Sequence, residues 1–415
     1  MPHGDPPTAD QRRALSRRVL FFCLYLSEGA PIGYIWLALP TRLRVAGVPV
    51  PEIAQLTALA VLPWTFKFVW APLLDLLRGP RWGLRRWVLA AQSVMGLTLM
   101  ATQGLVLPRD MAALTTLLMV HAVAAATQDV GVDALCISST TPSERGRLNG
   151  WMQAGMLLGR SLMGGGALVM AEWIGHGPVV WLLVVVTTFS MLVLQLSGLE
   201  EPPREATRTL RWAQIREAAL GALDDRRTWY GLGFAVLGGA GFKSLEVLIG
   251  PFLVDHGYSQ QEVGWFSALP MIAAMTFGSV AGGVLADRHS RARIAGACLM
   301  LLSLTIAVLG ALDLATGGAR GVALLALLVV VALLIGVFTA ASYALFMDLT
   351  RPALAAAQYS AFMGATNGCE AWSSYAAGAL VAASGYPAAL ISMATVSLLA
   401  LPFLARMSAP AGEPS

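Results

Sequence analysis

The chain alternates between long apolar runs and short polar segments. Apolar runs of about 20 residues are long enough to cross the hydrocarbon core of a bilayer as a helix, and a helix satisfies its own backbone hydrogen bonds there. The pattern therefore predicts an all-α membrane protein with twelve transmembrane helices. The expected ranges are 19–41, 52–74, 87–107, 111–138, 147–172, 177–198, 229–254, 261–286, 294–313, 319–346, 354–382 and 386–405.

One long polar stretch divides these spans six and six, and the two halves look alike. The turn after the first span recurs after the seventh, at the positions Pro40, Gly47 and Glu52 and then Pro251, Gly257 and Glu262. Such a repeat predicts two six-helix bundles with a site between them near the membrane midplane. We expect a tail, a bundle, a linker, a second bundle and a second tail at 1–18, 19–198, 199–228, 229–406 and 407–415.

Composition and charge agree with this topology. Of the 415 residues, 56% are hydrophobic and 13% are charged, against roughly 25% charged in an average soluble protein. Arginines gather in the N-terminal tail and in the loops predicted to share its side, and such basic loops lie on the cytoplasmic side of a membrane. We therefore expect a multi-pass protein of the bacterial inner membrane with both termini in the cytoplasm. The net charge of +4 reflects this topology, so no nucleic-acid partner is expected.

Eight ionisable residues lie well inside the predicted spans. They are Lys67, Arg160, Lys243, Glu28, Asp129, Asp133, Glu246 and Glu370. Three bases and five acids leave a net charge of −2 if all are ionised, and an uncompensated buried charge is expensive. We therefore expect some of the carboxylates to take up protons, which makes proton coupling possible.

Asp129 and Asp133 are the strongest candidates for the coupling protons. They are four residues apart and share one helix face beside Gln128. Two carboxylates on one face repel each other, which favours protonation of one of them. The alternative is a static network in which Lys67 or Arg160 holds both. Glu28, next to Gly29 and Pro31 near the middle of the first span, is the third candidate, either lining a cavity or packing.

Other intramembrane polar residues are candidates for substrate binding. Lys243 and Glu246 are three apart on one face, so they either neutralise each other or contact the ligand, and the glycine-rich run 238–241 just before them is expected to loosen the helix. Arg160 either binds an anionic group of the substrate or pairs with one of the aspartates. The full candidate set is Lys67, Arg160, Gln128, Lys243, Glu246, Glu370, Asn367 and Tyr375. Trp36, near the end of the first span, is interpreted as an anchor at the membrane interface.

Several motifs resemble known transporter families. The loop Gly282-Gly283-x-x-x-Asp287-Arg288-x-x-Arg291 resembles the signature loop of the major facilitator superfamily. SEGAPIGY (27–34), LPWTFKFVWAPLLD (62–75), ATQDVGVDA (126–134) and SERG (143–146) resemble the AmpG-type permeases, a group with muropeptide importers, siderophore importers and acetyl-CoA transporters. The resemblance implies the major facilitator fold and alternating access. Asp75, Asp287, Arg288 and Arg291 either form a conformational latch or simply end helices at the interface.

The residues and the resemblance together predict a proton-coupled secondary active transporter, a symporter that imports a polar, anionic solute. The resemblance implies an anhydro-muropeptide first, a siderophore second and an acyl-CoA compound third, while a membrane-embedded enzyme is the alternative from another class. The sequence has no Walker-type phosphate loop and no His/Cys cluster. We therefore expect no enzyme activity, no cofactor and no metal, and a monomer that works on a small-molecule solute and protons in the lipid bilayer.

Overall fold

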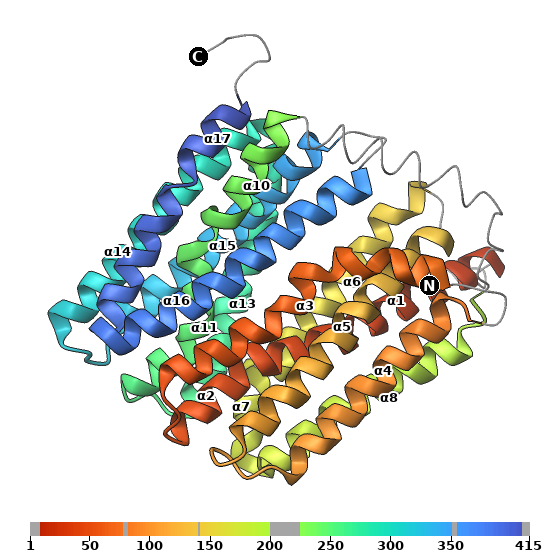
Figure 1. Cartoon of the computed structure of the whole chain (residues 1–415), viewed down its shortest axis with the longest axis horizontal. Helices are drawn as coiled ribbons and strands as arrows, with labels where there is room; N and C mark the ends of the chain where they lie inside the picture. The colour runs from red at the N-terminus through yellow and green to blue at the C-terminus, as the bar shows by residue number, and fades with distance from the viewer. Residues whose placement is uncertain (1–8, 78–81, 140–141, 200–224, 351–354, 409–415) are drawn as a thin grey trace, which may run out of the picture. The chain divides into compact units, whose positions relative to one another are not determined.

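The computed structural model describes residues 9–77, 82–139, 142–199, 225–350 and 355–408, and this part of the chain is helical nearly throughout (Figure 1). Its α-helices are α1 (Ala9–Gly33), α2 (Leu39–Val45), α3 (Val50–Leu77), α4 (Leu84–Ala101), α5 (Met111–Ser139), α6 (Pro142–Met163), α7 (Gly165–Ile174), α8 (His176–Leu196), α10 (Arg226–Gly238), α11 (Ala240–Asp255), α12 (Gln260–Phe266), α13 (Ile272–Arg288), α14 (Arg291–Thr316), α15 (Val322–Leu349), α16 (Ala355–Leu398) and α17 (Leu401–Ser408). Two π-helices, η1 (Tyr34–Ala38) and η3 (Ser267–Met271), and one 3-10 turn, η2 (Thr102–Gly104), complete the set.

The described residues account for the twelve predicted spans. Ten helical stretches are long and apolar enough to cross a membrane. The last of them, Gln358–Met407, has 50 residues and holds Gly385 at φ +79°, followed by Pro387, so two spans meet there in a turn. The 18-residue helix α4 supplies the remaining span. The prediction of a twelve-helix, all-α membrane protein is therefore confirmed.

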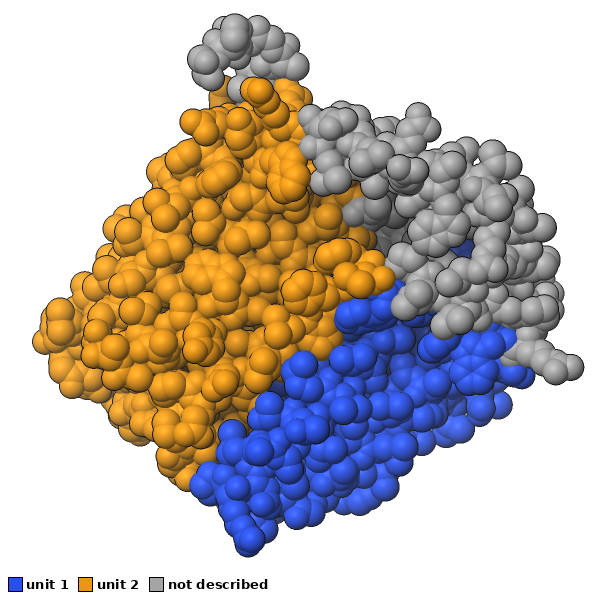
Figure 2. Space-filling model, viewed as in Figure 1, with its two compact units in different colours: residues 1–35, 70–204 blue, residues 36–69, 205–415 orange. Residues whose placement is uncertain are grey.

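The chain divides into two compact units (Figure 2). Unit 1 comprises Met1–Ile35 and Trp70–Arg204, and its core joins α1, α4, α5, α6 and α8 around side chains such as Phe21 and Val88. Unit 2 comprises Trp36–Val69 and Glu205–Ser415. One cluster of its core joins the start of α3 to α11 and α16. The predicted domain boundaries, which place residues 36–69 with the N-terminal bundle, stay a prediction.

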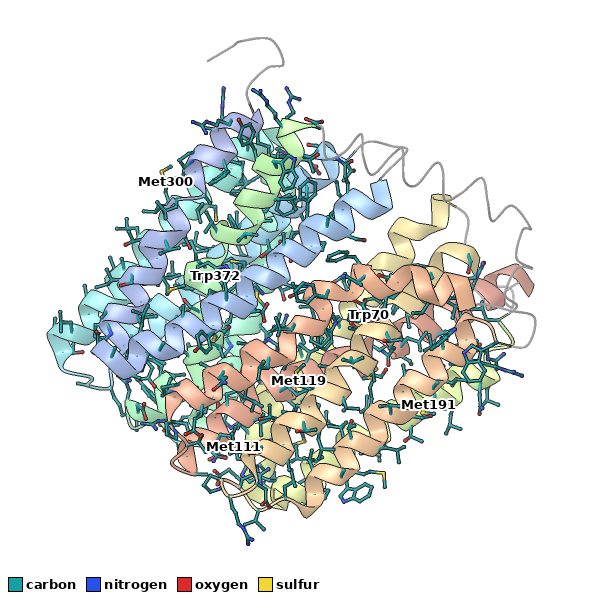
Figure 3. All side chains as sticks on the ribbon, in the orientation of Figure 1. Trp70, Met111, Met119, Met191, Met300 and Trp372 are labelled. Carbon is teal, nitrogen blue, oxygen red and sulfur yellow. The ribbon has the colours of Figure 1, made fainter. Side chains whose placement is uncertain are left out.

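Side chains on the outside of the helices are largely apolar (Figure 3). Met300 on α14 and Trp173 at the end of α7 are both exposed. The four cysteines are all buried and form no disulfide among the described residues, so they serve as small, largely apolar packing residues. Helices whose outer faces meet lipid need this distribution, because the hydrocarbon offers no partner for polar groups.

The internal repeat is visible in two matching turns. At the end of α2 the amide of Val48 donates to the carbonyl of Leu43 at 3.0 Å, and at the end of α11 Tyr258 donates to Leu253 at the same distance. The intervening glycines have φ +85° at position 47 and φ +77° at position 257. A left-handed glycine followed by this backward bond is the Schellman end of a helix. Gly47 and Gly257 therefore end a helix with the same type of turn in both halves of the chain.

Glycines also permit two very close helix contacts. A Cβ on Gly33 of α1 would lie 2.3 Å from the carbonyl oxygen of Arg160 on α6, and one on Gly278 of α13 would lie 2.0 Å from that of Leu333 on α15. No side chain fits in that space, so the backbones touch directly. Helix pairs in membranes pack through small residues in this way because lipid supplies no hydrophobic drive for association.

Candidate functional site

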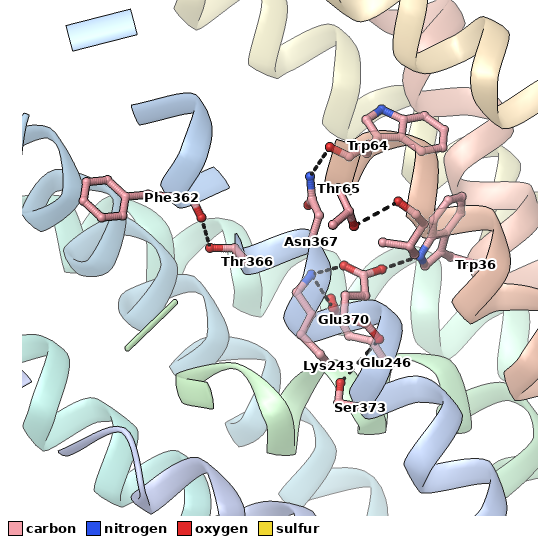
Figure 4. Close-up of polar contacts among 11 residues, drawn as sticks. Trp36, Trp64, Thr65, Lys243, Glu246, Phe362, Thr366, Asn367, Glu370 and Ser373 are labelled. Atoms are coloured by element: carbon pink, nitrogen blue, oxygen red, sulfur yellow. Dashed lines mark hydrogen bonds and ion pairs between the residues drawn. The ribbon is translucent and has the colours of Figure 1, made fainter. Parts of the chain in front are cut away.

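A charged cluster lies inside the membrane-spanning part of unit 2 (Figure 4). Lys243 on α11 places Nζ 2.6 Å from Glu370 Oε2 on α16 and 3.2 Å from Glu246 Oε2 one turn along α11. Trp36 of η1 donates its indole N–H to Glu370 Oε1 at 2.5 Å. We call these four residues the lysine cluster. It joins three helical elements that lie far apart in the sequence and carries one positive and two negative charges.

Local backbone features position this cluster. The seventh span is interrupted at Gly239, where α10 ends and α11 begins, and the amide of Lys243 donates to the Gly239 carbonyl at 2.9 Å. This is the place where the glycine run is expected to loosen the helix. Trp36 belongs to a π-helix, a form that often marks functional positions within membrane and soluble helices. The wider turn presents its indole to α16.

Neutral groups surround the cluster. The ring of Trp36 packs edge-on against that of Trp64 on α3, with centroids 5.8 Å apart. Asn367, one turn before Glu370, donates to the carbonyl of Trp64 at 3.4 Å. Phe242 lies beneath Lys243 Nζ, 5.4 Å from ring centroid to nitrogen. Further along α16, Trp372, labelled in Figure 3, donates to the Val236 carbonyl of α10 at 2.9 Å.

A second cluster, of acids, lies in unit 1. The hydroxyl of Tyr25 on α1 donates to Asp133 Oδ1 on α5 at 2.5 Å. Glu28, one turn along α1, and Asp129, one turn back along α5, are both buried. All three carboxylates act electrostatically on Tyr25. The structure therefore brings together the three residues that the sequence proposes for proton coupling, and it adds Tyr25, which the sequence reasoning missed although it lies three residues from Glu28.

The remaining candidates of unit 1 are placed as follows. Gln128 is fully buried, and its Nε2 donates to the Leu24 carbonyl of α1 at 3.5 Å, so it ties α5 to α1. Arg160 is half-buried on α6 and forms no ion pair with Asp129 or Asp133 within the part of unit 1 that the structure describes. The binding of an anionic group by Arg160 stays a prediction.

Two further substrate candidates lie in unit 2. Lys67 is half-buried on α3. Tyr375 is 59% exposed and follows Glu370 by five residues, which turns it about 140° away around α16 at about 100° per residue. The structure does not bring Tyr375 to the lysine cluster, and its role in binding stays a prediction.

The loop signature is partly visible. Arg291 at the start of α14 pairs with Asp348 near the end of α15, and its second nitrogen lies 3.9 Å from Asp287 at the end of α13. Arg288 is exposed, and the side chain of Asp75 lies outside the described residues. Arg291 thus links three helices at one end of unit 2, as a latch requires.

Three interactions of unit 2 were not expected from the sequence. Trp36 is not an interface anchor, because its indole points inward to Glu370. Arg44 on α2 pairs with Asp255 on α11 at 2.6 Å. His256 is buried beside Asp313 of α14, with Nε2 and Oδ1 2.5 Å apart. For the Arg44–Asp255 and His256–Asp313 pairs, the sequence shows only that these residues lie at the ends of predicted spans. Position at a span end does not predict which residue of another helix is the partner.

Comparisons with known proteins agree with this architecture. A family model described as Major Facilitator Superfamily matches residues 19–259 and 234–415. The putative transporter AmpG 4 of Rickettsia felis is 26% identical over 278 residues, which is 64% of this chain and 66% of that protein. The anhydromuropeptide permease of Escherichia coli K12 is 28% identical over 286 residues, which is 66% of this chain and 56% of that protein. The matched region therefore spans less than two thirds of the length of these relatives.

Solved structures of transporters share the fold. The D-xylose-proton symporter superposes with a TM-score of 0.74 at 13% identity, over 94% of this chain and 97% of that chain. The nucleoside transporter NupG gives 0.70 at 13% identity, over 96% and 100%. The predicted resemblance to the AmpG-type permeases is thus confirmed, and the chain is a multi-pass secondary transporter of small molecules and not an enzyme. Because the family model covers nearly the whole chain, the protein belongs to the major facilitator superfamily.

Proposed function

We propose that the protein is a proton-coupled symporter that imports an anionic, polar solute, an anhydro-muropeptide, across the bacterial inner membrane, with both termini in the cytoplasm. The observation that carries the proposal is the acidic cluster of unit 1. Glu28 and Asp129 are buried in membrane-spanning helices beside the Tyr25–Asp133 hydrogen bond. Carboxylates in such a place are costly when ionised and are the usual elements of proton relays in transporters.

The solute is proposed from two independent supports. The relatives with the names AmpG 4 and anhydromuropeptide permease match about two thirds of this chain. A muropeptide carries peptide carboxylates, and the protein offers basic side chains inside its spans for them. Lys67 and Arg160 are half-buried on α3 and α6, and Lys243 belongs to the lysine cluster. The basic side chains would serve an anionic siderophore equally, so the names of the relatives are what favours the muropeptide over that alternative.

The test is uptake into proteoliposomes that contain the purified protein. With an imposed pH gradient, alkaline inside, labelled anhydro-muropeptide should accumulate above its external concentration. Asp133→Asn should abolish this accumulation and leave exchange of solute across the membrane intact, because the amide binds no proton. Asp110→Asn is the matched control, since Asp110 accepts the Val106 amide in a loop, its one ion pair in the described residues is a 4.0 Å contact with exposed Arg109, and an asparagine keeps the accepting oxygen.

The outcomes separate the parts of the proposal. If a ferric siderophore accumulates and the muropeptide does not, the proposed symport mechanism stands and the proposed solute is wrong. Accumulation of muropeptide without any response to the pH gradient would overturn proton coupling. Full accumulation by Asp133→Asn would remove that residue from the mechanism and leave Asp129 and Glu28 to be tested.

A further inference from the structure

The two carboxylates of the lysine cluster are not equivalent. Both oxygens of Glu370 accept strong donors, Oε2 from Lys243 at 2.6 Å and Oε1 from Trp36 at 2.5 Å. Glu246 makes one contact within the described residues, an ion pair of 3.2 Å with the same lysine. The side chain of Glu246 is also more exposed, at 23% against 11% for Glu370. Glu370 is therefore the fixed partner of Lys243, and Glu246 is the loosely held one.

The charge of the cluster is unbalanced in this state. One ammonium faces two carboxylates, so the ionised cluster carries a net charge of −1 inside a membrane-spanning region, where a net charge is costly. Four other described groups beside Lys243 are neutral: Phe242 on α11, Trp36 on η1, Asn367 on α16 and the phenol of Tyr343 on α15. A proton is the simplest species that removes the excess charge, and the loosely held carboxylate is the one that can accept it.

We infer that Glu246 is an exchangeable carboxylate, which a carboxylate group of the solute replaces on Lys243 while Glu246 takes a proton. Before exchange Lys243 holds Glu370 and Glu246, and afterwards it holds Glu370 and the solute. Because the anion enters together with one proton, the cluster stays at a net charge of −1, whereas the same anion without the proton would bring it to −2. The inference rests on the proposed symport and names the chemical class recognised at this site, a carboxylate, and the residue that makes its binding depend on protons.

The exchange also explains the geometry of the cluster. Glu246 lies on the same helix as Lys243, so it can swing away without any movement between helices. Glu370 comes from α16 and is held by the indole of Trp36, so it keeps Lys243 oriented while the other position changes occupant. Trp36 is accordingly a positioning residue that acts through Glu370.

The direct test uses acetate as the probe and infrared difference spectroscopy on the full chain in lipid nanodiscs. Isotopically labelled acetate is exchanged for chloride at constant ionic strength and pH, so that its own bands separate from those of the protein. The wild-type protein should gain the stretching band of a protonated carboxyl group. Glu246→Gln should lack this band and Glu246→Asp should restore it. Glu172→Gln, at an exposed position on α7, should leave it unchanged.

A binding measurement gives a second readout. Because each acetate brings one proton, the apparent affinity of the wild-type protein should fall about tenfold per pH unit on the alkaline side. Glu246→Gln imitates the protonated state, so its affinity should no longer depend on pH in that range. Glu370→Gln should instead weaken binding at every pH, because Lys243 loses its fixed partner.

The results distinguish this inference from the proposed function. A carboxyl band that persists in Glu246→Gln, or a wild-type protein that shows neither the band nor a pH-dependent affinity, overturns the exchange. If the protein accumulates muropeptide but shows no such band, the proposed function stands and the inferred exchange at Glu246 is wrong. If the band depends on Glu246 but the protein does not transport muropeptide, the inferred exchange stands and the proposed solute is wrong.

Discussion

Arg44 Nε lies 2.6 Å from Asp255 Oδ1, and Oδ2 of the same carboxylate accepts the hydroxyl of Tyr386 at 2.7 Å. This arrangement fastens α2 to the end of α11 and to α16 at the end of unit 2 that is predicted to face outward. Replacing Arg44 by Gln removes the ion pair. Because both side chains are partly exposed, we expect a loss of about 0.5–1 kcal/mol. Amide hydrogen exchange in residues 39–45 should then quicken a few-fold.

The control for this change is Arg42→Gln on the same helix. Arg42 forms no ion pair within the described part of unit 2, so its replacement should leave hydrogen exchange in α2 as it is. Equal acceleration in both variants would mean that the effect comes from lost positive charge on α2 and not from the contact with Asp255.

Tyr25 is expected to matter for coupling because it donates to Asp133. Tyr25→Phe keeps the ring and removes the hydroxyl, which takes from Asp133 a hydrogen bond to a charged group, a class of contact that contributes about 1.5–3 kcal/mol. Uptake driven by a pH gradient should fall at least tenfold while solute exchange continues. Tyr230→Phe is the matched control, because the ring of Tyr230 contacts Arg406 and that contact does not need the hydroxyl. Equal uptake by Tyr25→Phe and wild type would place Tyr25 outside the coupling mechanism.

The sequence predicts what depends on local pattern and misses what depends on distant contacts. Hydropathy locates the spans because each one has to cross the bilayer by itself. Glycine spacing likewise locates the turns at Gly47 and Gly257, which need a positive φ. By contrast, Trp36 reaches Glu370 across 334 positions of the sequence, through a π-helix that no residue pattern announces.

The acidic cluster lies between these two cases. The spacing of Asp129 and Asp133 is enough to put them on one face of α5. The helix that faces them is a matter of tertiary packing, and that packing brings α1 with Tyr25 and Glu28 to α5. Intramembrane charge therefore identifies the residues to examine, while the structure supplies their partners.

The contact between α1 and α6 makes a prediction about stability. A methyl group at position 33 would lie 2.3 Å from the carbonyl oxygen of Arg160, which is backbone and cannot move aside. Gly33→Ala should therefore destabilise the protein by about 1–3 kcal/mol or prevent its insertion. Gly96→Ala on α4 is the control, since nothing lies within 4 Å of the added atom and alanine is the better helix former. The measurement is thermal unfolding in detergent. Equal stability of the two variants would show that α1 and α6 have room to separate.

His256 and Asp313 form a buried pair whose loss should cost far more than that of an exposed pair. Nδ1 of His256 faces the Phe252 carbonyl at 2.6 Å and Nε2 faces Asp313 Oδ1 at 2.5 Å, so both ring nitrogens meet acceptors. Both residues are buried, at 6% and 4% exposure, so the contact has little access to solvent.

Asp313→Asn replaces the carboxylate that faces His256 Nε2 with an amide. Removing one partner of a buried pair costs about 3–5 kcal/mol, so the unfolding temperature in detergent should fall by several degrees. The comparison is Glu262→Gln, which weakens the exposed pair with Arg320. Gln keeps the oxygen that caps Ser259, so its cost should stay within about 1 kcal/mol. If both variants lose the same stability, the His256–Asp313 contact does not fasten α11 to α14, and the close approach of the two side chains contributes little to the fold.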